Sequence, residues 1–484
     1  MLFNSINFLV FFSIVTSIYF IIPYKYRWML LLSSSCYFYM AFLPIYILII
    51  AFTIVIDYFA GILIENSQGR KRLILLLCSI VANVGILIAF KYYNFINDNI
   101  TSLSTYYGYA NPLTNLHILL PLGLTFHTFQ GMSYNIEIYR GRQIAEKHFG
   151  IYSLYVMFYP QMVAGPIERP QNMLHQFYEN HKFDYLRVTN GLKLMLWGFF
   201  IKVVIADNLA IIVNKVFAHS NEVGGLGIIT AVIAFSIQIY CDFSGYSAIA
   251  IGAAQIMGIT LMTNFRRPYF ASSISEFWTR WHISLSTWFR DYIYIPLGGN
   301  KVRTAKWVVN IFIVFLISGL WHGANWTFVV WGALHGLFIV IGRILNPIKS
   351  TFSNTLRLYK FPKIKNLVST SFTILLVAFT WIFFRAVNLD QALFLVKNVF
   401  RNWHLDDLRF ALSALSRDRV PKLIFLTFVI LLFAVEYYQE HYGSIKQLLI
   451  NQNIVVRWTV YLFLVFSIII FGAYDNLNFI YFNF

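Results

Sequence analysis

Two histidines are the residues of this sequence whose surroundings most favour chemistry. His322 lies in ISGLWHGANWTFVVWGALHG, residues 317–336, an apolar run long enough to span a bilayer. In such surroundings an imidazole is expected to stay neutral near pH 7, and a neutral imidazole can act as a general base. The alternative is a core histidine bonded to a backbone carbonyl, and the pattern alone leaves both interpretations open.

His282 belongs to SEFWTRWHISLSTWFRD, residues 275–291. At about 100° per residue on a helical wheel, the segment separates into an aromatic arc and a polar arc, with His282 near the boundary. The pattern predicts one amphipathic helix that is too charged to cross a bilayer and lies at an interface or lines a polar cavity. A surface anchor whose histidine meets lipid headgroups is the alternative.

Glycines close to His322 are expected to shape its helix. Gly319 and Gly323 form one small-xxx-small pair and Gly332 and Gly336 another, which would let neighbouring backbones approach closely. Gly323, together with Asn325, is also predicted to break the helix beside His322, as irregular backbone is tolerated where it lines a cavity.

Other polar groups in apolar segments are interpreted singly as packing or helix-pairing groups. His335 lies thirteen residues after His322, about 220° away on a continuous helix, so it is expected to be structural. Residues 160–170, PQMVAGPIERP, predict a re-entrant or broken element. The remaining polar groups of this kind are Gln130, Tyr134, Glu168, Arg169, Asp242 and Ser244.

Motifs of several soluble enzyme classes are missing from the sequence. It contains no GxSxG elbow, Walker loop, HExxH motif or dinucleotide fingerprint. Cys36, Cys78 and Cys241 form no CxxC pair, so neither a disulfide framework nor a metal site is expected.

The elements that must position these residues are membrane helices. Apolar residues make up 58% of the chain and charged residues 12%, and the mean hydropathy is +0.64; ordinary soluble domains are about a quarter charged. We therefore predict an all-α polytopic membrane protein with roughly ten to thirteen membrane elements, the first of them a retained helix rather than a signal peptide. The clearest begin near Phe3, Ile45, Leu73, Leu192, Ile228, Val308, Trp326, Leu367, Leu423 and Thr459.

The formal charge of +17 agrees with a membrane location. Basic residues sit in short loops, at Lys25 and Arg27, at 70–72, at Arg140 and Arg142, and at 349–365. Lysine and arginine in short loops are typical of the cytoplasmic side of a membrane protein, so a nucleic-acid partner is not expected.

The chain is predicted to be a single membrane-embedded domain, residues 1–484. Residues 1–98 are expected to form plain N-terminal helices, residues 121–345 the catalytic core, and residues 366–484 the C-terminal helices. Polar and ionisable residues inside a membrane are costly and default to function, so chemistry is expected in the central part.

Longer motifs resemble the membrane-bound O-acyltransferase family, and specifically its bacterial alginate O-acetyltransferase branch. They are CDFSGYS, FRRPYFASSISEFWTRWHISLSTWFRDYIYIPLGGN and SGLWHGANWTFVVWGALHG, supported by FYPQMVAGPIERP, TFQGMSYNIEIYRG, TWIFFRA and the terminal FIYF. They follow one another in the expected order from about Pro121 to Phe484. Ala248 and His127 depart from the pattern, which often has an acidic residue and a tyrosine there.

The resemblance implies a helical bundle enclosing a tunnel, in the bacterial inner (cytoplasmic) membrane. His322 matches the catalytic histidine of the family and His282 its second histidine, 322 − 282 = 40 residues earlier. The implied acyl donor is acetyl-CoA with no bound cofactor. Arg280, Arg290 and Lys301, near His282, are candidates to hold its phosphates, and contacts with lipid headgroups at the interface are the alternative for each of them. The implied acceptor is an exported polysaccharide or a periplasmic partner acetyltransferase.

Three other functions remain open from the sequence. One is transfer of D-alanine to teichoic acid within the same family. A secondary transporter of a small anion would also place histidine, aspartate and arginine inside many helices. The third is a non-catalytic membrane scaffold, which would keep its function without either histidine.

Overall fold

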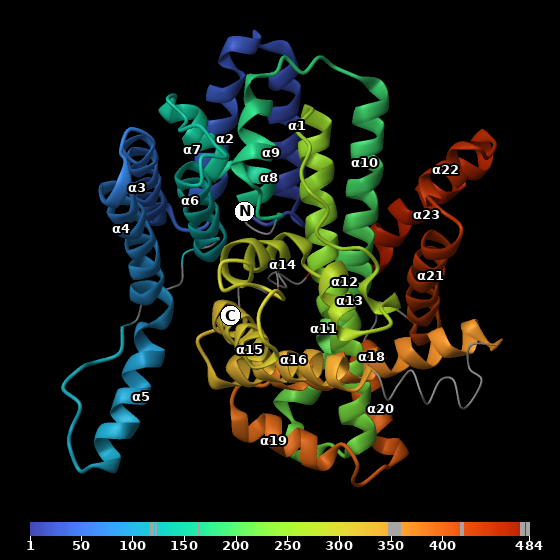
Figure 1. Cartoon of the computed structure of the whole chain (residues 1–484). Helices are drawn as coiled ribbons and strands as arrows, with labels where there is room; N and C mark the ends of the chain where they lie inside the picture. The colour runs from blue at the N-terminus through green and yellow to red at the C-terminus, as the bar shows by residue number, and fades with distance from the viewer. Residues whose placement is uncertain are drawn as a thin grey trace. The chain divides into compact units, whose positions relative to one another are not determined.

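The computed structural model describes residues 1–116, 121, 123–162, 165–346, 360–416, 421–474 and 480. Within these residues all regular secondary structure is helical (Figure 1). The fold is therefore all-α, as predicted. The described chain divides into two compact units, one of residues Met1–Met195 with Ser247–Met262, the other of Leu196–Tyr246 with Thr263–Phe484. The predicted single domain remains a prediction.

The first unit holds the N-terminal helices. Its helices are α1 (Ile6–Ile21), α2 (Arg27–Met40), α3 (Ile47–Glu65), α4 (Gly69–Leu87), α5 (Tyr93–Tyr106), α6 (Leu124–Tyr139), α7 (Phe149–Met157), α8 (Tyr159–Met162) and α9 (Pro170–Met173). Shorter 3₁₀ segments cover Tyr24–Tyr26, Pro44–Tyr46 and Leu174–Tyr178, and a π-helical turn covers Ile88–Tyr92. The region of PQMVAGPIERP is broken into α8 and α9, as predicted, although Val163 and Ala164 lie outside the described residues.

Two helices cross the boundary between the units, namely α10 (Tyr185–Phe199) and α12 (Gly225–Met257). The second unit adds α11 (Asp207–Ala218), α13 (Ile274–Arg280), α14 (Ile283–Phe289), α15 (Thr304–His322), α16 (Trp326–Ile344), α18 (Pro362–Arg385), α19 (Leu389–Asn398), α20 (Leu405–Ser413), α21 (Lys422–His441), α22 (Ile445–Ile450) and α23 (Ile454–Phe471). Its π-helical turns are η5 (Phe200–Ala206) and η8 (Arg290–Tyr294), and 3₁₀ turns cover Ser220–Glu222, Pro268–Phe270 and Ala414–Ser416.

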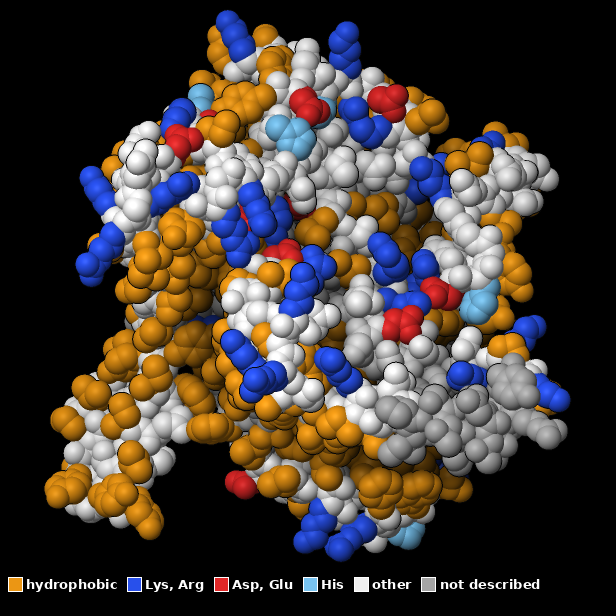
Figure 2. Space-filling view, viewed as in Figure 1, with side chains coloured by type: hydrophobic (Ala, Val, Ile, Leu, Met, Phe, Trp, Pro, Cys, Tyr) orange, Lys and Arg blue, Asp and Glu red, His pale blue; other side chains and the backbone are white. Residues whose placement is uncertain are grey.

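Nine helices among the described residues are long and apolar enough to cross a membrane, and α1 is a shorter apolar helix. Each of the nine contains one of the starting points expected from the sequence, and α1 begins three residues after the remaining one, Phe3. The described residues thus hold nine such helices, where the sequence predicted roughly ten to thirteen membrane elements. Their outward faces carry large exposed hydrophobic side chains, for example Leu48, Phe52 and Val81 at 61%, 58% and 68% exposure. Figure 2 shows hydrophobic side chains over the faces of the N-terminal helices, with lysine and arginine gathered toward their upper end in this view. The chain is accordingly a multi-pass membrane protein whose exposed apolar faces suit lipid.

The helices α15 and α16 form a closely packed hairpin, drawn in yellow to orange in Figure 1. A Cβ atom on Gly319 would lie 2.2 Å from the Phe328 carbonyl oxygen, and one on Gly332 would lie 2.2 Å from the Phe315 carbonyl oxygen. Both glycines are therefore needed for the two backbones to touch. A Cβ atom on Gly336 would lie 3.5 Å from its nearest neighbour, which is an ordinary van der Waals distance. Gly336 is therefore not part of this close crossing.

Candidate active site

His322 is the last residue of α15, where the helix breaks. Gly323 follows with an extended backbone, and α16 begins three residues later at Trp326. The sequence prediction of a break at this glycine is confirmed. A side chain on Gly323 would collide with the Phe328 ring at 2.1 Å, so the break needs glycine. The break places a histidine at a helix terminus.

Aromatic rings surround the His322 imidazole, which is 2% exposed. Ring centroids of Trp321, Trp331 and Phe384 lie 4.9, 4.9 and 5.3 Å from it, all at steep interplanar angles. Phe384 comes from α18 and Trp331 from α16, so three helices build this cage. The His322 imidazole therefore lies among the rings of three helices, in largely apolar surroundings.

His282 interrupts the amphipathic segment that the sequence predicted as one helix. That prediction was wrong: α13 ends at Arg280, α14 begins at Ile283, and His282 between them has a left-handed backbone with φ of 42°. Non-glycine residues seldom adopt this conformation, which persists when the surrounding structure imposes it and often marks a functional site. The kink turns His282 fully inward, at 0% exposure.

Asn264 fixes the orientation of the His282 ring. Its Oδ1 accepts a hydrogen bond from the Ser284 hydroxyl at 2.9 Å and lies 3.2 Å from His282 Nδ1. Because this oxygen is an acceptor, Nδ1 carries the proton, and Nε2 is left with the lone pair. Burial lowers the pKa of His282 to about 3, so the ring is neutral at any physiological pH.

Trp321 connects the two histidines. Its ring centroid lies 5.9 Å from that of His282 and 4.9 Å from that of His322. Two residues forty positions apart in the sequence therefore contact one indole in the interior of the second unit. This arrangement suits a neutral base beside a second, oriented imidazole.

His335 has the surroundings of a structural residue. Trp278 Nε1 donates to its Nδ1 at 3.2 Å, and Thr380 Oγ1 lies 3.0 Å from its Nε2, so both ring nitrogens have partners. The angle calculated for a continuous helix does not apply, because α15 and α16 are separate helices. The Trp331 ring lies against both His322 and His335, at 4.9 and 4.8 Å.

The three basic residues considered for phosphate binding lie in different surroundings. Arg280 is bound by two carboxylates, Glu276 at 2.6 Å and Glu440 at 2.9 Å. Arg290 pairs with Asp291 at 2.8 Å, and its side chain is 59% exposed. Lys301 is exposed in the loop before α15. Of the three, Arg290 lines a cavity.

This cavity has a volume of about 520 Å³ and lies in the second unit. Arg266 and Arg290 supply its positive charge, while its walls are aromatic and aliphatic side chains of α13 to α16, interspersed with hydroxyl groups. Trp278, which holds His335, is part of the wall. A cavity of this size, apolar with a few polar groups, is typical of a small-molecule site.

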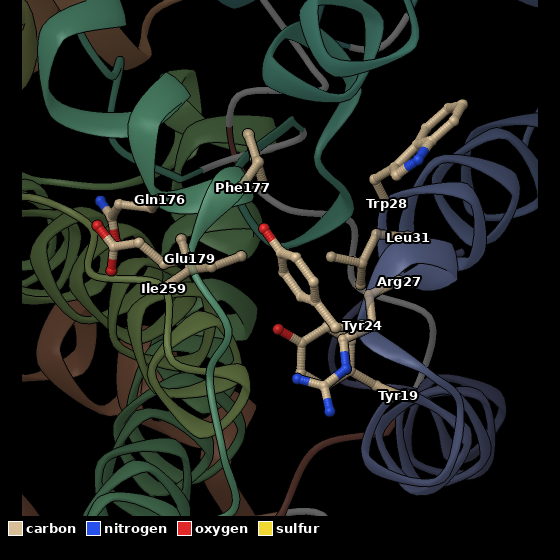
Figure 3. Close-up of a pocket in the computed structure, with 9 residues that line it drawn as sticks. All are labelled: Tyr19, Tyr24, Arg27, Trp28, Leu31, Gln176, Phe177, Glu179 and Ile259. Atoms are coloured by element: carbon tan, nitrogen blue, oxygen red, sulfur yellow. The ribbon is translucent and has the colours of Figure 1, made fainter.

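A second pocket lies in the first unit (Figure 3). It has a volume of about 10 Å³ beside Arg27 and Glu179, which suits no more than a water molecule.

One buried ion cluster could not be read from the sequence. Lys202 in η5 forms ion pairs with Asp207, at 2.6 Å, and with Asp242 of the CDFSGYS motif, and all three are at most 2% exposed. The backbone N–H of Ile480, near the C-terminus, donates to Asp242 Oδ2 at 2.8 Å. Asp242 therefore binds the C-terminal segment and the π-helical turn, which is a structural role. Asn264 was also missed, because nothing local distinguishes it from any polar loop residue.

Comparison with known proteins gives one family for this chain. The model of the family described as MBOAT, membrane-bound O-acyltransferase family, matches residues 142–384. A probable alginate O-acetylase AlgI of Azotobacter vinelandii is 37% identical, over 90% of this chain and 85% of that protein. A peptidoglycan O-acetyltransferase of Helicobacter pylori is 35% identical, over 77% of this chain and 73% of that protein. A teichoic acid D-alanyltransferase of Streptococcus thermophilus is 30% identical over 46% of this chain and 56% of that protein.

Proposed function

The chain belongs to the membrane-bound O-acyltransferase family and is an O-acyltransferase, and from this premise we propose that the group it transfers is acetyl. The donor is acetyl-CoA, and the acceptor is a hydroxyl of an exported polysaccharide or of a periplasmic partner transferase. The relatives that match most of the chain are named as O-acetylases or O-acetyltransferases, whereas the D-alanyltransferase matches under half of it. The membrane involved is the bacterial inner membrane.

The observation that carries the proposed mechanism is the pair of histidines on Trp321. His322 acts as the general base and takes the proton of the acceptor hydroxyl as its oxygen attacks the thioester carbonyl. The tetrahedral intermediate then collapses: the C–S bond breaks, and the proton passes to the departing thiolate of CoA. Assistance by a general base is worth about 10²–10⁴-fold in rate.

Two roles for His282 are compatible with the sequence: orienting the acyl donor, or stabilising the oxyanion that develops on the thioester carbonyl. An imidazole that stabilises an oxyanion must donate a hydrogen bond. Since Nδ1 faces Asn264, the nitrogen that would face the reactants in this mechanism is Nε2, which is an acceptor in this tautomer. Of the two roles considered, orienting the donor through one of its N–H groups is the one that this tautomer supports.

Acetyl transfer by His322→Ala tests the mechanism. Membranes containing the variant, incubated with radiolabelled acetyl-CoA and acceptor, are expected to lose activity by a factor of about 10²–10⁴. His441→Ala is the matched control, because this exposed histidine stacks on Tyr437 at the end of α21, outside the cage. Wild-type rates in His322→Ala, at equal amounts of folded protein, would contradict the proposal.

Further measurements distinguish the proposed acyl transfer from the other functions that the sequence leaves open. A transporter would take up a small anion into vesicles without forming an acylated product. A scaffold would retain its function when both histidines are replaced. Mass spectrometry of surface glycans from a deletion strain identifies the acceptor polymer, and a loss of D-alanine esters instead of acetyl esters would favour the teichoic acid reaction.

A further inference from the structure

Two short segments of the second unit, residues 264–267 and 280–284, lie side by side and enclose the kink at His282. Two backbone hydrogen bonds join them, one on each side of the histidine: from the Arg266 N–H to the Arg280 carbonyl at 2.8 Å, and from the Ile283 N–H to the Asn264 carbonyl at 2.9 Å. We call this pair of segments the His282 clasp.

The His282 clasp contains backbone that local propensity does not favour. Three non-glycine residues among those described have a left-handed backbone, and two of them, Arg267 with φ of 45° and His282 with φ of 42°, belong to the clasp. Such conformations persist only when surrounding contacts impose them. Because the two segments are short, contacts from outside them are expected to help keep the clasp closed.

Glu440 of α21 binds both segments of the clasp with one carboxylate. Its Oε2 lies 2.6 Å from Arg267 Nε, and its Oε1 lies 2.9 Å from Arg280 Nη1. Arg267 belongs to one segment and Arg280 to the other, so this carboxylate bridges the two. It comes from 160 to 173 residues further along the chain.

This bridge is partly shielded from water. The side chains of Arg280, Glu440 and Arg267 are 17%, 20% and 26% exposed, and partly buried ion pairs are screened by salt less than pairs on the surface. Glu440 also lies in the last turn of α21, where the helix dipole disfavours a negative charge. The two arginines offset this cost, so the placement of the carboxylate is explained by the clasp and not by the helix.

A second carboxylate of α21 reaches the same place through a tyrosine. Glu436, one turn before Glu440, accepts a hydrogen bond from the Tyr240 hydroxyl. The Tyr240 ring lies 5.9 Å from the Phe265 ring and 6.2 Å from the Trp281 ring, between centroids, and these two residues belong to opposite segments of the clasp. Helix α21 therefore contacts both segments by charge and, through Tyr240, by aromatic packing.

We propose that Glu440 is a positioning residue of the acyl-transfer site: by joining Arg267 to Arg280 it maintains the backbone that directs the His282 ring. It acts through the clasp and not on the reactants. Rate depends steeply on the placement of an orienting group, since the reacting atoms must be held in a near-attack geometry. The catalytic part of this inference rests on the acetyl transfer proposed above, whereas the effect of Glu440 on the clasp does not.

Hydrogen–deuterium exchange of the purified full-length protein in detergent tests the effect on the clasp. Glu440→Gln keeps the size of the side chain and removes its charge. Peptides containing the Arg266 and Ile283 amides are expected to exchange faster in this variant, because the clasp opens more often. Glu65→Gln, which removes an ion pair with Lys147 in the first unit, is the matched control and should leave these peptides unchanged. Unchanged exchange in Glu440→Gln would overturn the proposal.

Steady-state turnover tests whether the clasp acts through His282. Glu440→Gln is expected to lower kcat by a factor of about 10 to 10² and to leave the KM for acetyl-CoA nearly unchanged. Arg267→Gln removes the bridge from its other end and should give the same result. In a His282→Ala background, Glu440→Gln should have almost no further effect, because the group that it positions is gone.

A general loss of structure would instead lower the rate by the same factor in both backgrounds, and this additive result would overturn the proposal. Failure of the proposed function is distinguishable from this outcome. A wild type that transfers no acetyl group would contradict the proposed function, and the exchange measurement would still decide whether Glu440 holds the clasp.

Discussion

At the scale of single residues, the two histidines differ in what fixes them. His322 is surrounded by aromatic rings, whereas His282 is held through Asn264 by a hydrogen bond and a strained backbone. The first arrangement gives an imidazole apolar surroundings, and the second fixes the direction of its ring. These are the requirements of a base and of an orienting group, respectively.

The protonation of His282 predicts how acid affects stability. Its pKa is lowered from 6.5 to about 3 by burial, so between these values the unfolded chain binds a proton that the folded chain does not. Stability is therefore highest above pH 6.5 and falls as the pH decreases, by about 1 kcal/mol at pH 5.5 from this group. The Tm of His282→Gln, compared with wild type at pH 7.5 and 5.5, is expected to fall less on acidification. Equal losses in both proteins would contradict the assignment.

Arg290 and Arg280 are expected to respond differently to replacement by methionine. Arg290 lines the cavity, so Arg290→Met is expected to raise the KM for acetyl-CoA about tenfold, the value of one charge-assisted hydrogen bond. Arg280 is occupied by Glu276 and Glu440, so Arg280→Met is expected to lower the Tm and leave KM nearly unchanged. Steady-state kinetics and a melting curve for each variant test both expectations. An unchanged KM in Arg290→Met would show that this residue does not bind the donor.

At the scale of elements, the hairpin of α15 and α16 offers a matched pair of substitutions. Gly319→Ala inserts a methyl group against the Phe328 carbonyl, and overpacking of this kind costs typically about 1–3 kcal/mol. Gly336→Ala on the same hairpin has ordinary space. We expect Gly319→Ala to lower both the Tm and acetyl transfer, since His322 lies three residues further on, and Gly336→Ala to change neither. Similar effects in both variants would exclude the crossing as the cause.

The elements also show how far the sequence could predict this structure. Long apolar runs predicted the spanning helices, and Gly323 predicted the break at His322, because both signals are local. The kink at His282 was not predicted, since its left-handed backbone is imposed by contacts with Asn264 and not by local propensity. The partners of Asp242 were missed for the same reason, because they lie tens of residues away in the sequence.

At the scale of the whole molecule, contacts inside the first unit predict a membrane orientation. Arg72 Nη2 donates a hydrogen bond to the Ile138 carbonyl at 2.8 Å. The basic turn at 70–72 therefore lies next to the end of α6, which is followed by the basic loop with Arg140 and Arg142. Loops rich in lysine and arginine face the cytoplasm, and Phe42 precedes the opposite end of α3.

Labelling of single cysteines in intact cells tests this orientation. After Cys36, Cys78 and Cys241 are replaced, Lys71→Cys and Arg142→Cys are expected to react with a membrane-impermeant maleimide only once the membrane is opened. Phe42→Cys should react from outside. Labelling of all three positions from the same side would contradict the predicted topology.

The aromatic cage around His322 has a consequence for the competition between acetyl transfer and hydrolysis of the donor. A thioester beside a general base is open to attack by water as well as by an acceptor, and each such event discards an activated acetyl group. The rings of Trp321, Trp331 and Phe384 lie next to the imidazole. In the proposed mechanism, we expect these apolar surfaces to disfavour an attacking water relative to a bound acceptor hydroxyl. The rings would then favour transfer over hydrolysis, and the ratio of transferred to hydrolysed acetyl is the quantity that measures their effect.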